Sequence, residues 1–355
     1  MSKTVSEKKV YNGLDVFKLI ASILVIILHA IETNSWYPSE IKFVFTRLAV
    51  PFFFITSGFF FHQGINNATN KFDYFQKYEK KLMKLFFIWA LLIYLPFEII
   101  SYVEKYPTAS VGKLCLYLFR RIFVIGPGPY WYLIALMWSA AFLYFCNVKR
   151  KNGLIYSGII IGLILEVLYA CFRGVLQDNN IFNCIFSGIY FIYSWEFNFI
   201  MFGIPFMGIG YIISDKDYFC KTRNALVVLI LATVGRIVEY NMSFLFPGEF
   251  WKENVLSIAF IVQAVAYFML AQSIDLKIKR ESSLCIRQLS SFIYFFHAIF
   301  LYEFLNPFLK SVGMKDVYAD YLIFFKVLLT LFICVLIFYV IKKIDNRYLN
   351  ILING

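Results

Sequence analysis

Runs of mostly apolar residues, each ~20 residues long, recur along almost the whole chain and constrain its fold more than any other feature. A helix of that length crosses the hydrocarbon core of a bilayer. Backbone polar groups are satisfied in lipid only by helices and closed barrels. We therefore predict an all-α integral membrane protein with about ten transmembrane helices, near residues 14–32, 44–62, 83–103, 129–147, 153–172, 196–213, 224–244, 254–274, 287–306 and 321–342.

The composition agrees with this fold class. Of the 355 residues, 61% are hydrophobic and 16% are charged, whereas a soluble domain averages ~25% charged residues. The net charge of +12 would suggest a nucleic-acid partner in a soluble protein. Cytoplasmic loops of membrane proteins collect Lys and Arg, so we expect membrane lipids as partners and no nucleic acid. The seven cysteines are scattered without a C-x-x-C pair, so no disulfide framework and no metal site are expected.

The distribution of basic residues predicts the topology. If the N-terminus is cytoplasmic, about twice as many Lys and Arg fall in the inner segments as in the outer ones. This bias favours ten spans with both termini cytoplasmic, in a multi-pass protein of the cell membrane. The first apolar run has no small-residue cleavage site, so we expect it to be retained. No soluble domain is recognisable, and residues 1–355 are predicted to form a single membrane domain.

Two further segments have their own patterns. Residues 113–125 place two arginines among apolar residues, which predicts an amphipathic helix lying on the membrane surface. Residues 181–195 are predicted to add a re-entrant or interfacial piece.

The first apolar run carries a polar stripe. In a helix Asp15, Lys18, Ser22 and His29 fall within an arc of ~60°. Lys18 is then at the cytoplasmic mouth and His29 is ~16.5 Å further along the axis. Ionisable groups inside a membrane usually face a bundle interior or a wet cavity. The stripe predicts a cation and a titratable base in one water-accessible cavity. The alternative is that Asp15 pairs with Lys18 at the interface and His29 only bonds across helices.

The K-x₁₀-H spacing of Lys18 and His29 resembles the first helix of acyltransferase family 3. Five later segments are similar to motifs of that family, in the same order. They are "FTRLAVPFFFITSGFFF" (45–61), "KYEKKLMKLFFIW" (77–89), "YWYLIALMWS" (130–139), "FNFIMFGIPFMGIGY" (197–211) and "SSFIYFFHAIFL" (290–301). The chain departs from the family pattern with lysines at Lys81 and Lys84, with Phe197 where arginine is common, and without a histidine before Trp131.

The resemblance implies a reaction. Such proteins transfer an acyl group, usually acetyl, from cytoplasmic acyl-CoA to a hydroxyl outside the cytoplasm. The subgroup that the chain resembles includes surface-sugar O-acetyltransferases and the membrane half of vancomycin-resistance serine racemases. We therefore expect acetyl-CoA or another acyl-CoA as donor, no metal, and a cell-surface glycan or lipid-linked sugar as acceptor. A racemase domain and an extracytoplasmic esterase-like domain are not expected.

This reaction suggests roles for individual residues. His29 is predicted to be the general base, with covalent acyl transfer through it as the lesser alternative. Asp15 is too far along the helix to orient the imidazole, so the partner of His29 must come from another helix. The donor phosphates are predicted to bind Lys18, Lys81 and Lys84, although Lys81 and Lys84 are equally typical of positive-inside anchors.

The acceptor side is predicted to include Arg47, Trp131, Tyr294 and His297. Each has a structural alternative: snorkelling for Arg47, an aromatic belt for Trp131 and bundle packing for Tyr294 and His297. His62 receives no role. Two other functions remain open, a polysaccharide-precursor transporter or flippase and a small-molecule carrier without acyltransferase activity. The residues leave the acceptor, the acyl chain and the oligomeric state open.

Overall fold

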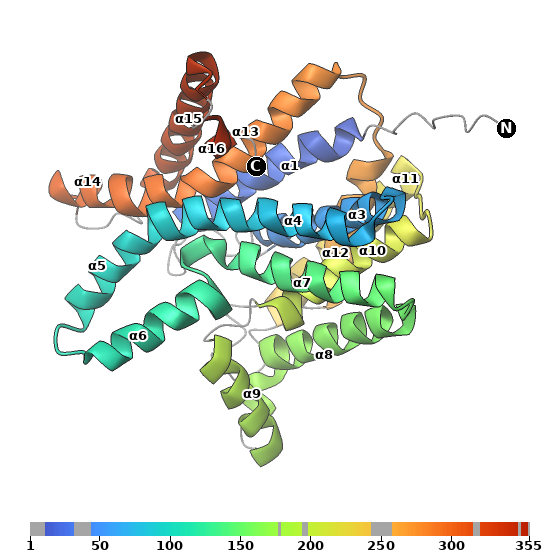
Figure 1. Ribbon diagram of the computed structural model, residues 1–355, viewed down its shortest axis with the longest axis horizontal. Coiled ribbons are helices and arrows are strands. Elements are labelled where there is room, and N and C mark those ends of the chain that lie inside the picture. Colours follow the sequence, from blue (N-terminus) through green and yellow to red (C-terminus); the bar gives the residue numbers. More distant parts are fainter. Residues whose placement is uncertain are drawn as a thin grey trace.

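The computed structural model describes residues 11–31, 44–176, 179–193, 198–242, 258–314, 320–346 and 349–353, in which every regular element is a helix (Figure 1). The α-helices are α1 (Asn12–Ala30), α3 (Ala49–Asn67), α4 (Lys71–Leu85), α5 (Leu95–Lys105), α6 (Val111–Arg120), α7 (Trp131–Val148), α8 (Asn152–Leu176), α9 (Asn180–Tyr193), α10 (Ile204–Asp215), α11 (Thr222–Met242), α12 (Ile258–Ser273), α13 (Arg280–Ala298), α14 (Asn306–Ser311), α15 (Asp320–Ile344) and α16 (Asn350–Ile353). The all-helical prediction is confirmed for these residues.

Short segments of other helix types connect or extend these helices. Two 3₁₀ turns precede α3 and α7, at Thr46–Leu48 and Gly128–Tyr130. Four π-helical segments continue into or out of α-helices, at Phe86–Tyr94, Arg121–Ile125, Phe199–Gly203 and Ile299–Leu305.

Within the described residues, seven helical stretches are long and apolar enough to cross a membrane. They are Asn12–Ala30, Thr46–Asn67, Lys71–Lys105, Gly128–Val148, Thr222–Asn241, Arg280–Ser311 and Leu322–Ile344. Four apolar helices are shorter: Asn152–Leu168, Asn180–Ile189, Phe199–Asp215 and Ile258–Ser273. Each of the ten apolar runs overlaps one of these stretches, and the remaining short helix lies in the predicted interfacial piece at 181–195. Residues 32, 196–197, 243–244 and 254–257 of the runs lie outside the described residues.

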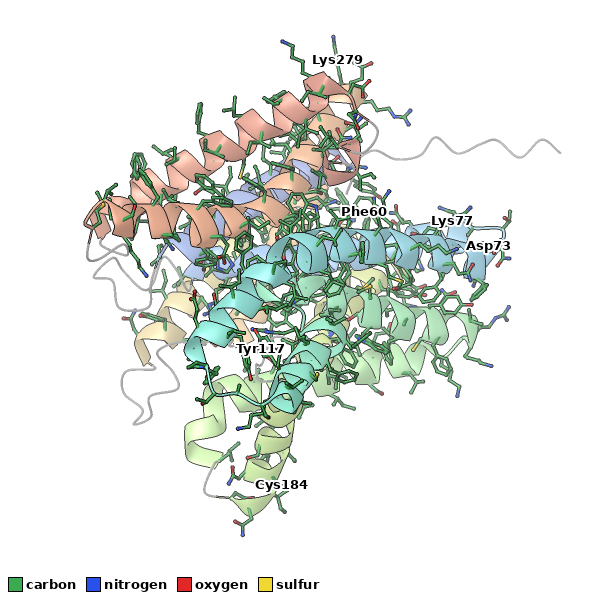
Figure 2. All side chains as sticks on the ribbon, turned by 60° about the vertical axis from the view of Figure 1, so that its left-hand side comes forward. Phe60, Asp73, Lys77, Tyr117, Cys184 and Lys279 are labelled. Atoms are coloured by element: carbon green, nitrogen blue, oxygen red, sulfur yellow. The ribbon has the colours of Figure 1, made fainter. Side chains whose placement is uncertain are left out.

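Some charged residues lie towards the starts of helices. Figure 2 shows Asp73 and Lys77 near the N-terminal end of α4 and Lys279 at the start of α13. The polar first turns of α4 are stabilised by Asn70, whose side chain accepts hydrogen bonds from the backbone N–H groups of Phe72 and Asp73. The helix therefore begins well before the predicted span at 83–103, and the apolar part follows through Phe86–Tyr94 into α5.

Residues 113–125, predicted to form an amphipathic helix, are helical as part of α6 and the π-helical segment Arg121–Ile125. Its polar side is fixed by Glu98 of α5, which accepts hydrogen bonds from Tyr117 (3.2 Å) and from the backbone N–H of Gly128 (2.8 Å) and pairs with Arg121 (3.2 Å). Its apolar side chains Leu116 and Phe119 are exposed. This division into a polar and an exposed apolar face is the one predicted for an amphipathic helix.

Helix α1 is central and packs against α3, α12, α13 and α15. Its neighbour α13 runs in the same direction. Asp15 near the start of α1 bonds Ser283 and Arg287, whereas His29 near its end bonds Tyr302 beyond α13. Parallel packing is what the predicted topology requires, because the first and ninth runs would both cross from the inside to the outside.

Helices α3 and α10 approach each other at two glycines. A Cβ atom placed at Gly58 would overlap the carbonyl oxygen of Met207, and one placed at Gly210 would overlap the carbonyl oxygen of Ile55. Small residues let helix backbones approach closely in membranes. The family-like segments 45–61 and 197–211, which contain Gly58 and Gly210, are therefore two sides of one helix contact.

Replacing Gly58 with alanine is expected to destabilise the protein by ~1–3 kcal/mol, because overpacking forces the two backbones apart. The measurement is the thermal unfolding midpoint in detergent. Gly153 of α8 is a matched control, since a Cβ there meets no atom within 4 Å. Equal midpoints for Gly58→Ala and Gly153→Ala would contradict this account of the contact.

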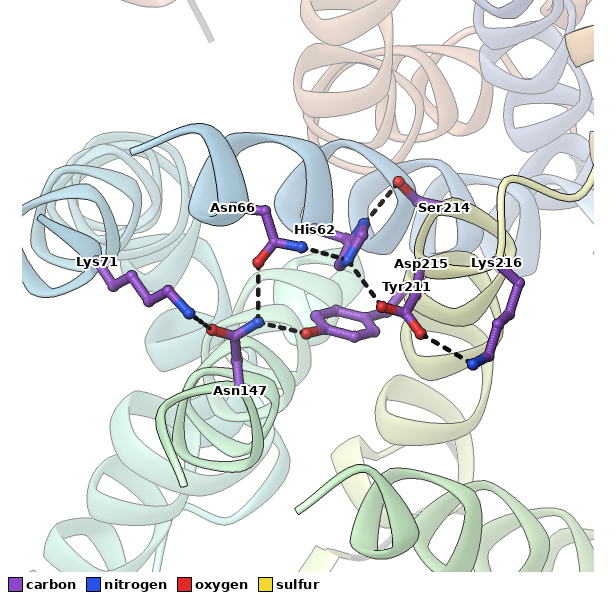
Figure 3. A network of polar contacts seen from close by, with 8 residues as sticks. All are labelled: His62, Asn66, Lys71, Asn147, Tyr211, Ser214, Asp215 and Lys216. Carbon is purple, nitrogen blue, oxygen red and sulfur yellow. Dashed lines mark hydrogen bonds and ion pairs between the residues drawn. The ribbon is translucent and has the colours of Figure 1, made fainter. Parts of the chain in front are cut away.

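A polar network joins the end of α3 to α4, α7 and α10 (Figure 3). The ring of His62 contacts Ser214 through Nδ1 (2.8 Å) and Asn66 (2.6 Å) and Asp215 (3.3 Å) through Nε2. Asn147 of α7 extends the network with bonds to Tyr211, Asn66 and Lys71. His62 thus holds helix ends together.

Candidate functional site

His29 lies at the end of α1 beside a tyrosine that follows α13. Its Nδ1 is 2.8 Å from the hydroxyl of Tyr302, and the same hydroxyl is 3.5 Å from the backbone oxygen of His29. A tyrosine hydroxyl can donate one hydrogen bond through its proton and can also accept a hydrogen bond at its oxygen. With that proton directed to the backbone oxygen, Nδ1 donates to Tyr302 and Nε2 becomes the basic nitrogen of the ring.

The position of Tyr302 depends on a local change of helix type. Residues Ile299–Leu305 form a π-helical segment that continues α13. Such segments are rare and frequently occur at functional sites. Here the segment presents Tyr302 to α1, so the partner of the histidine comes from another helix, as predicted.

His297 lies against His29. The two ring centroids are 5.2 Å apart and the rings are tilted by 34°. His297 is fully buried, and its Nδ1 is 3.0 Å from the carbonyl oxygen of Ile293. Tyr294 is also buried, with its ring centroid 6.2 Å from that of His297, but its hydroxyl donates to the carbonyl oxygen of Pro129 (3.3 Å). The structure therefore brings His29, His297 and Tyr294 together and engages the Tyr294 hydroxyl in packing.

Asp15, at the other end of α1, is held by α13. Its carboxylate accepts hydrogen bonds from Ser283 (2.7 Å) and, in a bidentate arrangement, from Arg287 (2.9 and 2.8 Å). The Asp15 side chain is 2% exposed and that of Arg287 is 47% exposed. The ion pair of Asp15 is thus with Arg287 rather than Lys18, although Lys18 is also attracted by the carboxylate. The other part of that alternative, a bond of His29 across helices, is present as its contact with Tyr302. Arg287 outcompetes lysine because its planar fork matches a carboxylate.

Lys18 lies close to further positive charge. Its Nζ is 5.2 Å from the ring centroid of Phe60 in α3, and it is attracted by Asp15 and repelled by Arg287 and Lys81. Such proximity of three cations suits a polyanionic ligand. Lys84 is exposed on α4, and no contact within the described residues links it to Lys18. Of the three predicted donor-site lysines, the structure brings Lys18 and Lys81 together.

The residues of the polar stripe on α1 contact different neighbouring helices. Asp15 and His29 face α13 and its continuation, whereas Lys18 leans towards α3. Ser22 is buried and donates to the carbonyl oxygen of Leu19 in its own helix (2.8 Å). Ser22 shares the predicted stripe, but its hydroxyl is engaged within α1. A serine hydroxyl in a helix readily bonds a preceding carbonyl when no better partner is near.

Two further acceptor-side residues were predicted, Trp131 and Arg47. Trp131 begins α7 and packs on Phe54 and Phe202, with ring centroids 6.1 and 5.8 Å away. It also lines a small pocket with Asn198 and Phe199. Arg47 lies half-buried in the 3₁₀ turn Thr46–Leu48, which contacts α1. Phe197, a departure from the family pattern, lies outside the described residues.

Two site residues were not identified from the sequence. Arg287 looked like one of many basic residues near a membrane surface, and Tyr302 is one of 25 tyrosines. Neither has a spacing to Asp15 or His29 that a pattern search detects, because more than 260 residues separate the partners. Together the described contacts give α1 a cationic end near Asp15 and an imidazole end at His29, ~21 Å apart along the helix axis.

Comparisons with known proteins give a family and a set of relatives. The model of a family described as an acyltransferase domain matches residues 11–348. An amino-acid racemase of Enterococcus faecalis is 30% identical over 230 residues, which is 62% of this chain and 30% of that protein. A serine/alanine racemase of Enterococcus gallinarum is 22% identical over 239 residues, 64% of this chain and 32% of that protein. The chain thus spans about a third of the length of these relatives. No solved structure matches.

Proposed function

This chain belongs to acyltransferase family 3, whose domain covers nearly all of it, and from that membership we propose that it is an O-acyltransferase of the cell membrane. The proposed reaction moves an acetyl group from cytoplasmic acetyl-CoA to a hydroxyl of a cell-surface glycan or lipid-linked sugar. The observation that carries the proposal is the single helix α1, which has His29 with its Tyr302 partner at one end and Lys18 among cations at the other.

The proposed topology has ten spans, counting the three shorter helices that match apolar runs, and both termini in the cytoplasm. The bias of basic residues and the parallel packing of α1 and α13 support it. A reporter fused after Gly355 should then be cytoplasmic. An extracytoplasmic signal would contradict this topology.

In the proposed reaction, the phosphates of the donor lie near Lys18, Lys81 and Arg287, and the pantetheine arm carries the thioester towards His29. Nε2 of His29 takes the proton of the acceptor hydroxyl while the oxygen of that hydroxyl attacks the thioester carbonyl carbon. The carbon–sulfur bond breaks, the coenzyme A thiolate leaves, and the proton held by His29 neutralises it. Tyr302 orients the ring through Nδ1, which favours the basic tautomer throughout.

The direct test is donor consumption. Purified protein in detergent should slowly hydrolyse acetyl-CoA, because water replaces the missing acceptor. The thiol released is measured with a chromogenic disulfide reagent. Protein that releases no thiol, with or without membrane glycolipid, would exclude the proposed reaction.

Replacing Lys81 with glutamate is expected to raise the KM for acetyl-CoA about tenfold. The reversal removes one attraction and adds one repulsion, each worth ~0.2–1 kcal/mol at an exposed site. The effect should shrink as salt is added. Lys80→Glu is the matched control, since Lys80 is an exposed neighbour on α4. If both variants change KM equally, Lys81 acts only as a topology anchor.

The relatives supply an observation for a second candidate function. They are named as racemases of amino acids, and the chain matches about a third of their length. A membrane carrier for an amino acid or similar small molecule is therefore the alternative. Uptake of a labelled amino acid into proteoliposomes without any consumption of acetyl-CoA would favour it.

A further inference from the structure

His297 presents a buried nitrogen whose hydrogen-bonding capacity is unused within the described residues. The residue has 0% exposure, and its Nδ1 is 3.0 Å from the carbonyl oxygen of Ile293. A carbonyl oxygen only accepts, so Nδ1 carries the proton. Nε2 of the neutral ring is then an acceptor, and no partner for it is present in this part of the chain.

An acceptor of this kind indicates a missing donor. Buried polar atoms in proteins are nearly always hydrogen-bonded, and leaving one unsatisfied destabilises the folded protein. Protonating Nε2 gives no relief, because it would create a buried charge whose N–H also needs a partner. The group that completes the site must therefore bring an O–H or N–H.

The side chains around His297 do not supply this donor. The hydroxyl of Tyr294 donates to Pro129, and the hydroxyl of Tyr130 donates to the carbonyl oxygen of Phe295 (2.6 Å). The ring that faces His297 is that of His29, with the two centroids 5.2 Å apart. A donor bound at Nε2 of His297 therefore lies next to the imidazole assigned to proton transfer.

We propose that Nε2 of His297 binds a second hydroxyl of the acceptor, adjacent to the hydroxyl that His29 deprotonates. The inference rests on the proposed acyl transfer and specifies its acceptor as a 1,2-diol, as found in sugar rings and polyols. In such an acceptor one hydroxyl would bond each imidazole, at ~2.8 Å, and the two ring centroids are 5.2 Å apart. A site that pairs a substrate hydroxyl rejects the analogue lacking it, because the protein atom is left unpaired.

Two small acceptors of the same ring size test this selectivity. With labelled acetyl-CoA, the wild-type protein is expected to acylate trans-1,2-cyclohexanediol with a kcat/KM about tenfold above that for cyclohexanol, equivalent to about 1.4 kcal/mol. The leucine side chain of His297→Leu has no polar atom. In this variant the ratio of kcat/KM for the diol to kcat/KM for cyclohexanol should fall to about one, because the KM for the diol rises. In His297→Gln, whose side-chain oxygen accepts hydrogen bonds, part of the preference should remain.

The control is His62→Gln, a change at the other buried histidine, which should keep the preference for the diol. A wild-type protein that does not prefer the diol, or a His297→Leu protein that does, overturns the inference.

Binding of the diol without acetyl-CoA, followed by saturation-transfer NMR, separates the inference from the reaction. Binding that is lost in His297→Leu supports the site even if no acyl transfer occurs. Transfer without diol selectivity removes the inference and leaves the proposed function standing.

Discussion

Replacing His29 with alanine is expected to abolish most acyl transfer while the protein still folds. A general base contributes ~10²–10⁴-fold to rate, equivalent to ~3–5 kcal/mol of barrier. The bond to Tyr302 that is lost together with the imidazole is worth only ~0.6–2 kcal/mol in a membrane. The two effects therefore differ enough in size to be separated by measuring initial rates and thermal unfolding on the same preparation.

Tyr302→Phe provides the graded comparison. It keeps the ring and removes the hydroxyl that contacts Nδ1, so we expect a smaller loss of rate and a shifted pH profile, because the histidine loses its orienting partner. An active His29→Ala protein would exclude His29 as the base, whatever the behaviour of Tyr302→Phe.

Replacing Arg287 with alanine is expected to lower the free energy of unfolding by about 3 kcal/mol, the largest stability effect predicted here. The change leaves the buried carboxylate of Asp15 without its bidentate partner, and breaking a buried ion pair from one side costs ~3–5 kcal/mol. The lower end applies because the arginine side chain is 47% exposed. Thermal or chemical unfolding in detergent measures it.

The double variant Asp15→Ala/Arg287→Ala should be more stable than Arg287→Ala, because no uncompensated charge remains. Arg280→Ala, at the exposed start of α13, controls for loss of positive charge near the membrane surface. If Arg287→Ala unfolds like Arg280→Ala, the carboxylate has another compensating partner.

The sequence was informative wherever the information is local. Twenty-residue apolar runs predicted the helices, because length and hydrophobicity alone decide whether a segment suits a bilayer. The face of α1 that carries Asp15 and His29 followed from helix geometry. The helix Val111–Arg120 followed from its mixture of basic and apolar residues.

The partners of those residues could not be predicted because they depend on packing between distant helices. Nothing local distinguishes Tyr302 from other interfacial tyrosines, or Arg287 from a topology anchor. The hydrogen-bond partner of Ser22 could not be predicted either. A serine in a helix donates to a carbonyl oxygen of its own helix unless a neighbouring helix provides a better acceptor. Lys84 shares its sequence motif with Lys81 but not its surroundings, since the described contacts bring only Lys81 near Lys18.

The π-helical segment Ile299–Leu305 makes the direction of the Tyr302 side chain sensitive to the number of residues in the segment. A π-helical turn accommodates one residue more than the α-helical turn it interrupts. Deleting a single residue before Tyr302 would let the α-helix continue, so the side chains beyond the segment would keep their direction while those inside it would shift about the axis. Tyr302 would then turn away from His29, although no residue of the site had been substituted. Among relatives, a one-residue gap at this point would therefore signal a different partner for the histidine even where both residues are retained.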